Sequence, residues 1–518
     1  MKTKNFFSVA LLGIFSLMSA DRVTAIEEVS TYLNRFHENP SAVMDEVVPK
    51  FDLYGNAIHR DLSKHEQEII AKSRDHFRKK IVDKKMLFRS SEEKSSYVSG
   101  DRVQELIPAS LMRIERNIHA LDAKRLTSGK VATQPWSDDY WPVYKGGLGF
   151  RYADKKLGEM EHTKWNNFFN YVKTYPAATL IEQGNSSLLS PSEKYDLLIG
   201  ANISPYGNQG LTAKMWKEGD NYARTSENGE VETWFGICHG WAAASYMLPR
   251  AIGPVIVQTA AGALTFYPAD IKALASLFWA NFQFKQSSVG GRCNVKPEKL
   301  NKDRSSGRIT DQECFDTNPG TWHLAVTHLL GMAKKTFIID ANFDYEVWNQ
   351  PLLTYRYNYF NPQTFKEYVK AENAMIKIKN YKKDKFKNFR SDDTSHVVGV
   401  RMKIAYMVEN TPVQRVVDHQ RYDAINTAEY LYDLELDQRG NIIGGEWYHN
   451  THPDFLWTPD YNLESLSAYD RSVEGEWNSN NAALPDSWAK AAKASAINAS
   501  LPLGKIISEL LRRSTVVE

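Results

Sequence analysis

The sequence predicts an α+β protein in which a helix that bears a cysteine packs on an antiparallel sheet. Three observations support this fold class. Residues 26 to 130 are highly charged and carry apolar positions at helical spacing. A glycine-flanked cysteine begins an alanine-rich run at 238–248, which is predicted to be a helix that stops before Pro249. Beyond Pro351 the apolar residues alternate or run without interruption, as they do in strands.

The composition bounds the class of protein. The chain has 518 residues and a formal net charge of +2, so its overall charge gives no sign of a nucleic-acid-binding protein. Its 13 tryptophans and 26 tyrosines argue against a disordered chain. We therefore expect a large globular protein with extensions and no nucleic-acid partner.

The first 25 residues have the pattern of a secretory signal peptide. Lys2 and Lys4 form a basic start, residues 6–20 form an apolar run, and small residues up to Ala25 offer cleavage sites. The apolar run is short for a transmembrane helix, and no later stretch qualifies. We expect a secreted or periplasmic protein without a membrane span.

Three segments follow the signal peptide. We assign residues 26–130 to a helical N-terminal segment, which is either an inhibitory pro-segment or a plain extension packed on the core. The aromatic, proline-bounded run from Gln134 to Pro142 cannot be regular helix and marks the start of a main domain at 131–465. Residues 466–518 are expected to form a helical tail.

Two local patterns in the main domain predict single elements. Ser190, Pro191 and Glu193 supply the cap, the first position and the capping-box partner of a helix. The alternating run 431–437, a polar turn and the run 442–447 predict a hairpin.

The three cysteines divide into a pair and a single thiol. Cys293 and Cys314 flank a loop-like polar run and form the natural disulfide in an exported protein. Cys238 is then left free within its glycine motif. No C-x-x-C or paired-histidine spacing accompanies the cysteines, so no zinc site is predicted and the metal site is unknown.

Cys238 is the candidate catalytic nucleophile. We expect it in the first turn of its helix, where the positive end of the helix dipole favours the thiolate. A neighbour on a helix points about 100° away, so His239 is expected to support the site by packing. The alternative is an inert cysteine in the core.

A thiol nucleophile needs a base and a group that orients the base. Residues 322–328 and 335–340 have the pattern of two paired strands. His323 lies on the first of them, and Asp340 ends the second. We predict that these two residues form a catalytic triad with Cys238.

Each partner of the thiol has an alternative. Strand parity points His323 and His328 to opposite faces, so only one of them can face Cys238. Asp344 is the alternative to Asp340 as the orienting carboxylate.

An acyl-transfer site also needs donors for the oxyanion. The backbone N–H of Cys238 is one candidate, and Gln134, Trp136 and Trp234 are candidates for the second. Trp234, Trp136 and Trp241 are also candidates for the walls of a tunnel that excludes water.

Several motifs, taken in order, resemble one family. The chain is similar to the transglutaminase elicitor family, the secreted transglutaminases of oomycetes and of some marine bacteria. The resemblance covers residues 130–460 and rests on these motifs: Pro135-Trp136, Tyr140-Trp141-Pro142, Leu189 to Asp196, Gly236 to Trp241, Asn318 to Leu324, Glu346 to Pro351, Gly444 to Trp447 and His452 to Trp457.

The resemblance implies a papain-like Cys–His–Asp acyl transferase. A glutamine carboxamide in a protein or peptide would acylate the thiol and release ammonia, and a lysine or another primary amine would then take the acyl group. The family roles fall on Cys238, His323 and Asp340. Calcium dependence is also implied, although the chain has no D-x-D-x-D-G loop, and no organic cofactor is expected.

The resemblance gives the segment Val347–Pro351 a second role. In the family it is the core of a surface peptide that plant immunity recognises, and this chain keeps those five residues but departs after them. Two other functions stay open. One is a cysteine protease or amidase with water as acceptor, and the other is a secreted elicitor or binding protein with a vestigial site.

Overall fold

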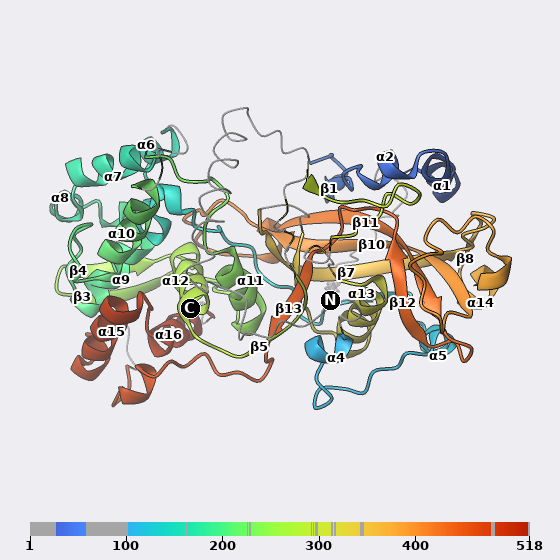
Figure 1. The fold of residues 1–518 in the computed structure, drawn as a ribbon. Helices are drawn as coiled ribbons and strands as arrows, with labels where there is room; N and C mark the ends of the chain where they lie inside the picture. The colour runs from blue at the N-terminus through green and yellow to red at the C-terminus, as the bar shows by residue number, and fades with distance from the viewer. Residues whose placement is uncertain are drawn as a thin grey trace, which may run out of the picture.

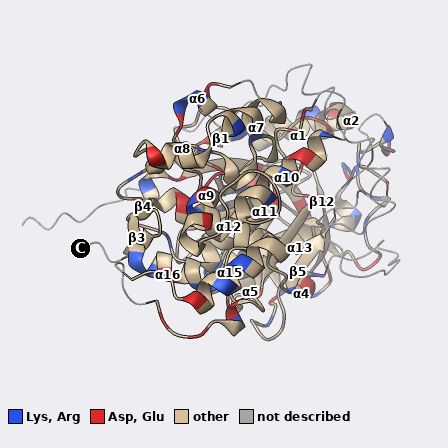
Figure 2. Ribbon diagram, turned by 90° about the vertical axis from the view of Figure 1, so that its left-hand side faces the viewer, with Lys and Arg blue, Asp and Glu red and all other residues tan. Residues whose placement is uncertain are grey.

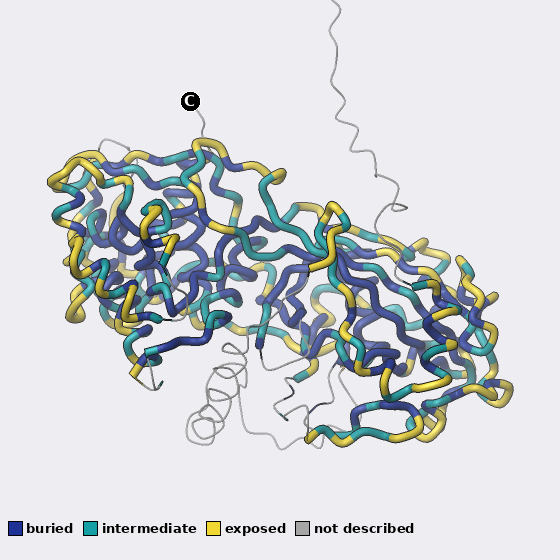
Figure 3. Tube along the Cα trace, turned by 90° about the horizontal axis from the view of Figure 1, so that it is seen from above, coloured by how far each residue is buried: buried dark blue, intermediate teal, exposed yellow. Residues whose placement is uncertain are grey.

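The computed structural model describes residues 27–58, 102–160, 164–224, 226, 229–291, 293, 295, 299–311, 314, 317–341, 346–477 and 482–515. The molecule has two halves side by side, one mostly helical and one built on a large antiparallel sheet (Figure 1). Buried segments run through the interior of both halves, and exposed segments follow the periphery (Figure 3). The mixed α+β class predicted from the sequence is confirmed.

The large sheet has eleven strands in the described part of the chain, and its paired neighbours are antiparallel. Its main path runs in the order β1 (Lys50–Asp52), β11 (Ala424–Leu436), β10 (His396–Val408), β7 (Asn349–Phe360), β6 (Ile338–Asp340), β13 (Phe455–Pro459) and β5 (Gln286–Gly290). The remaining strands are β12 (Ile442–Trp447) beside β11, β2 (Ser128–Lys130) and β8 (Glu367–Tyr368) beside β7, and β9 (Ile376–Lys377) beside β10.

The predicted hairpin forms between β11 and β12. Both strands contain aromatic and branched residues, which fit a pleated surface. The Asp437 carboxylate closes the turn by accepting the backbone N–H groups of Arg439 and Asn441, each at 2.8 Å. Gly440 supplies the left-handed backbone that this turn needs, with φ at 81°.

The helical half is formed mainly by the middle and the end of the chain. Its helices are α6 (Lys155–Gly158), α7 (Trp165–Thr174), α8 (Ala177–Glu182), α9 (Pro191–Ile199), α10 (Leu211–Ala223), α11 (Cys238–Met247), α12 (Pro268–Asn281), α15 (Asp486–Ala499) and α16 (Gly504–Thr515), and a small hairpin joins β3 (Val255–Thr259) to β4 (Gly262–Phe266). Charges of both signs are interspersed over this half (Figure 2).

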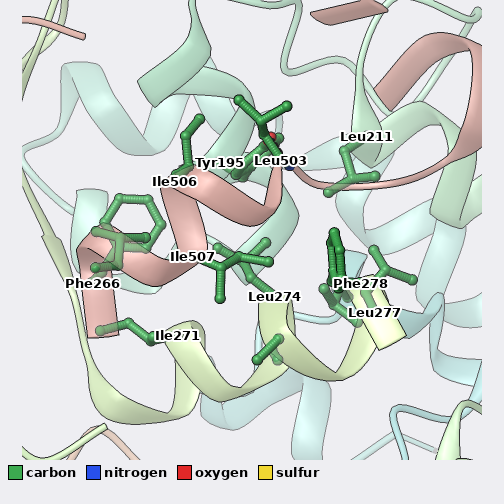
Figure 4. Close-up of a cluster of buried hydrophobic side chains, with 14 of the residues drawn as sticks. Tyr195, Leu211, Phe266, Ile271, Leu274, Leu277, Phe278, Leu503, Ile506 and Ile507 are labelled. Atoms are coloured by element: carbon green, nitrogen blue, oxygen red, sulfur yellow. Dashed lines mark hydrogen bonds between the residues drawn. The ribbon is translucent and has the colours of Figure 1, made fainter. Parts of the chain in front are cut away.

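Two predictions for the helical half are confirmed, the second of them in part. The Ser190 hydroxyl accepts the N–H of Glu193 at 3.2 Å, and the Glu193 carboxylate accepts the N–H of Ser190 at 2.8 Å, so α9 begins with the predicted capping box. The predicted tail over 466–518 is helical in part, at Asp486–Ala499 and Gly504–Thr515, while most of its earlier described residues are not, and α16 packs its apolar face on α12. Figure 4 shows Ile507 of α16 close to Leu274 of α12 in this core.

The N-terminal segment is less helical than predicted. Its described helices are short: α1 (Val29–Glu38), α2 (Pro40–Met44), α4 (Val103–Leu106) and α5 (Ile118–Ala123). Residues 59–101 lie outside the described residues. Leu106 and Leu121 are buried in the same core as the sheet, and β1 and β2 add strands to the sheet. Removal of the segment as a pro-segment stays a prediction.

The strand predicted at 322–328 is wrong, because these residues are helical. α13 (Pro319–Val326) packs against β11 and β12 and continues into a π-helical turn over 327–333. Asn318 caps α13 by accepting the N–H of Gly320 at 2.8 Å, and Pro319 takes the first position. This Asn-Pro start was the signal for a helix. The fully buried helix has no polar face, so its periodicity resembles a buried strand.

The remaining element is α14 (Ala371–Ala374), a single turn next to β8. None of the described helices has the length and apolar character needed to cross a bilayer.

Candidate active site

Cys238 is the first residue of α11 and is 5% exposed. α11 contacts α12 on one side and β7 of the sheet on the other, so the thiol lies where the two halves meet. The flanking glycines are required by close packing. A Cβ at Gly236 would overlap the carbonyl of Tyr140, and a Cβ at Gly240 would overlap the backbone of Ser276 in α12. Neither glycine has a left-handed backbone.

Two residues hydrogen-bond to the Cys238 sulfur: Val347, just before the strand β7, and Asn349, its first residue. Sγ lies 3.6 Å from the carbonyl oxygen of Val347, to which the thiol donates. The Asn349 side-chain amide donates to Sγ at 3.4 Å. The oxygen of the same side chain accepts the indole N–H of Trp457 at 2.8 Å. A buried chain of hydrogen bonds therefore links the thiol to β13 through one carboxamide.

Asp340 lies beside this chain of hydrogen bonds. It ends β6, as predicted, and it pairs directly with Asn349 in the β6–β7 ladder. Directly paired residues place their side chains on the same face of a sheet. One carboxylate oxygen of Asp340 accepts the backbone N–H of Trp348 at 3.0 Å. The ladder thus places Asp340 next to Asn349, whose side chain contacts Cys238.

The environment keeps the thiol protonated. Burial is the largest of the effects that together raise the pKa of Cys238 to about 12; the negative charges of Glu409 and Asp340 act in the same direction, and hydrogen bonds from Asn349 act against them. The expected lowering by the helix dipole is outweighed, since burial and two carboxylates act in the other direction.

His323 does not reach the thiol in this structure. Its ring lies 4.8 Å from the ring of Tyr357, and Nδ1 lies 2.8 Å from the hydroxyl of Tyr432. Tyr357 follows Asn349 by eight residues on β7, which is about 26 Å along a strand. The imidazole and the thiol therefore lie toward opposite ends of β7. Burial lowers the pKa of His323 to about 3, so this histidine is neutral.

The alternative base, His328, has both ring nitrogens in hydrogen bonds to the backbone. His328 donates through Nδ1–H to the carbonyl of Leu324 at 2.8 Å, and its Nε2 accepts the N–H of Glu115 at 2.8 Å. The Nε2 bond joins the N-terminal segment to this helical stretch, and the Nδ1 bond lies within it, so both ring nitrogens are used. His239 is half-buried, and burial lowers its pKa. The alternative carboxylate, Asp344, lies outside the described residues.

Three of the predicted oxyanion or wall residues make their hydrogen bonds elsewhere than at the thiol, although Trp241 stands in the first turn of α11. The Trp136 indole donates to the carbonyl of Leu248 at 3.3 Å, and the Trp241 indole donates to the carbonyl of Trp136 at 3.0 Å. Gln134 donates to the Asp423 carboxylate at 2.6 Å. Leu248 follows Cys238 by ten residues, which is about 15 Å along a helix. The structure therefore does not bring Gln134 or Trp136 to the thiol.

Trp234 is the predicted wall residue that stays near the thiol in the chain. It is 9% exposed and packs edge to face on Phe235, within the loop that leads into α11. Tyr140 fixes this loop, since its carbonyl accepts the N–H of Ile237 at 2.7 Å. The Tyr140 ring also contacts the indole of Trp348, with ring centroids 5.4 Å apart.

The cysteine pairing agrees with the prediction. Cys293 and Cys314 form a disulfide, and Cys238 is a free buried thiol. The described ranges contain no group of three or more His, Cys, Asp or Glu residues arranged to hold a metal ion. No residues in them are therefore assigned to calcium, and calcium dependence stays a prediction.

The residues in the hydrogen-bond chain from the thiol that sequence reasoning missed are Asn349 and Trp457. Both stand inside motifs that carry the family resemblance, but no pattern linked either of them to the cysteine. The segment Val347–Pro351 is also less exposed than a surface peptide. Val347 and Trp348 are half-buried, and the three residues after them are buried.

Comparisons with known proteins agree with the motifs. The family model of the transglutaminase elicitor matches residues 110–469, which is more than two thirds of the chain. A crystal structure of the GP42 transglutaminase from Phytophthora sojae is similar, with 20% sequence identity and a TM-score of 0.45. The match covers 69% of this chain and 91% of that one. A search among curated proteins finds no match. The chain therefore belongs to the transglutaminase elicitor family, and its enzyme class is that of the transglutaminases.

Proposed function

We propose that this chain is a secreted protein-glutamine γ-glutamyltransferase with Cys238 as its nucleophile. The observation that carries the proposal is the position of the single free thiol. It lies at the start of a tightly packed helix, beside a carboxylate that the neighbouring strands hold in place. Family membership supplies the class of reaction.

The reaction has two half-reactions at one sulfur. The Cys238 thiolate attacks the carboxamide carbon of a glutamine in a protein or peptide, and the carbonyl π electrons move to the oxygen. The C–N bond then breaks, and the nitrogen takes the proton that the thiol gave up and leaves as ammonia, which gives a thioester. The nitrogen of a lysine or another primary amine attacks the thioester, the S–C bond breaks, and an isopeptide remains, while the proton that the amine loses restores the thiol.

Three groups of this chain have proposed roles in that chemistry. Cys238 forms the thioester, and its backbone N–H, in the first turn of α11, is assigned as a donor to the developing oxyanion. Asp340 is the carboxylate of the site, held by the backbone N–H of Trp348. The proposal does not route a proton through His323, because its imidazole makes its hydrogen bond with Tyr432 instead.

The proposal keeps two parts of the papain-like arrangement predicted from the sequence and leaves out the histidine. Its supporting features are a cysteine at the start of a helix and an antiparallel sheet against that helix. The papain-like arrangement also requires a histidine at the thiol. Among the described residues the sulfur instead hydrogen-bonds to Val347 and Asn349.

Transfer of a labelled primary amine to casein tests the proposal. Wild-type protein is expected to incorporate the amine and release ammonia, and Cys238→Ala is expected to abolish both. Casein cleavage without amine incorporation would support the protease reading instead. Equal behaviour of wild type and Cys238→Ala would leave a vestigial site and contradict the proposal.

A further inference from the structure

The carboxamide of Asn349 occupies the position beside the thiol that a substrate carboxamide needs. Its nitrogen lies 3.4 Å from Sγ of Cys238, and its oxygen lies 2.8 Å from the indole nitrogen of Trp457. An indole N–H can only donate, so the bond to Trp457 identifies which end of the carboxamide is the oxygen. All three side chains are buried, with 2% exposure at Asn349.

This arrangement shares one contact with an acyl donor, the carboxamide oxygen on an N–H donor, although the carboxamide turns its nitrogen and not its carbon toward the sulfur. A glutamine that is to be attacked must place its carbonyl oxygen on an N–H donor and its carbon next to the sulfur. Asparagine carries the same functional group on a side chain that is one methylene shorter. Asn349 presents its nitrogen to the sulfur, and its backbone is held in the ladder with Asp340.

Trp457 is a rigid donor. It belongs to β13, which pairs with β6 at Trp457–Ile338 and with β5 at Trp457–Ser288. A donor held by two neighbouring strands keeps its direction when a ligand leaves, which is the property that oxyanion stabilisation requires.

We propose that Asn349 is an internal mimic of the glutamine donor and that Trp457 is the oxyanion donor which the mimic occupies. The inference rests on the proposed function. In the described state Asn349 and the carbonyl of Val347 cover the thiol. A glutamine side chain then binds by displacing the Asn349 carboxamide, so that its own carbonyl oxygen takes the indole N–H of Trp457.

The test compares two variants with two matched controls. Asn349→Ala removes the mimic, and Trp457→Phe removes the indole N–H but keeps an aromatic ring. Asn358→Ala is the control on the same strand, because Asn358 is exposed. Trp488→Phe is the control for a lost indole bond, since Trp488 donates to the carbonyl of Gly475 at 3.3 Å in the C-terminal tail.

The readouts are kcat and KM for transfer of dansylcadaverine to benzyloxycarbonyl-glutaminylglycine, together with the alkylation rate of Cys238 by iodoacetamide. For Asn349→Ala we expect an undiminished kcat, a several-fold lower KM for the glutamine donor and faster alkylation. For Trp457→Phe we expect a kcat lower by about 10²–10³-fold with Cys238 still alkylated. Both controls are expected to behave like wild type.

Each contrary result has one meaning. A folded Asn349→Ala variant that is as inactive as Cys238→Ala would show that Asn349 is required by the reaction, which overturns the mimic. An unchanged kcat in Trp457→Phe would overturn the donor role. If Asn349→Ala lowers the Tm, Asn349→Leu is used in its place, because leucine keeps the side-chain volume but has no carboxamide. Transfer retained by Cys238→Ala would overturn the proposed function itself.

Discussion

At the scale of single residues, the state of Cys238 is decided by what surrounds it. The N-terminus of a helix favours a thiolate by about 1 kcal/mol or less at ordinary sites. Burial together with the charges of Glu409 and Asp340 is a larger effect here, and it moves the pKa of the thiol up to about 12. The thiol form is therefore favoured in this arrangement, and we expect reaction to require that the sulfur loses its contact with Val347.

His323 gives a prediction at the same scale. Its imidazole is bonded to Tyr432 and lies about 26 Å along β7 from Asn349, so we expect His323→Gln to keep amine transfer per folded molecule. Amine incorporation and Tm should be measured for this variant, with His328→Gln as its control.

The triad predicted from the sequence requires the opposite outcome. If the His323→Gln variant loses amine transfer while its Tm is unchanged, His323 is the general base, as the sequence predicted. Loss that is accompanied by a lower Tm would be a structural effect, and in that case activity should be normalised to the folded fraction.

At the scale of elements, the α11–α12 contact holds the nucleophile. Gly240 has no side chain, so the backbone of α11 approaches the backbone of α12 at Ser276. Close contact between backbones transmits any displacement directly to Cys238, two residues earlier on the same helix. The alanine run 242–244 continues the same tight packing.

Gly240→Ala should therefore be costly. A Cβ at Gly240 overlaps the Ser276 carbonyl and Ala280, and overpacking of this kind costs about 1–3 kcal/mol in the free energy of unfolding. Gly158→Ala is the matched control, because a Cβ there meets nothing within 4 Å. Urea unfolding of both variants measures the difference. Equal midpoints for the two variants would show that the helices are free to separate.

At the scale of the whole molecule, much of the organisation could be predicted from the sequence. The order of cysteines predicted the disulfide and the free thiol, and the Ser190 capping box predicted the start of α9 because both signals are local. The contacts of Asn349 and Trp457 could not be predicted. They depend on the register of β6, β7 and β13, which come from distant parts of the chain. The helix at His323 was missed because uniform burial removes the periodicity that separates helix from strand.

Buried histidines predict how the whole molecule responds to acid. Burial lowers the pKa of His323 and His452 to about 3 and of His328 and His449 to about 4. In the unfolded chain these histidines bind protons below pH 6.5, while in the folded protein they stay neutral. Their contribution to the free energy of unfolding is therefore fully present above pH 6.5 and is lost as the pH falls toward 3. The Tm measured by calorimetry should therefore fall steadily from pH 7 to pH 4. A constant Tm over this range would show that the histidines are protonated in the folded state.

The most direct measurement is the mass of the acyl-enzyme at Cys238. The protein is incubated with a glutamine peptide in the absence of an amine, quenched with acid and digested. The account predicts a peptide containing Cys238 whose mass rises by that of the donor less ammonia, and hydroxylamine should remove the adduct. No adduct should form in Cys238→Ala. Two results would contradict the account. One is an adduct on a residue other than Cys238. The other is equal release of ammonia by the wild type and by Cys238→Ala, with no adduct in the wild type.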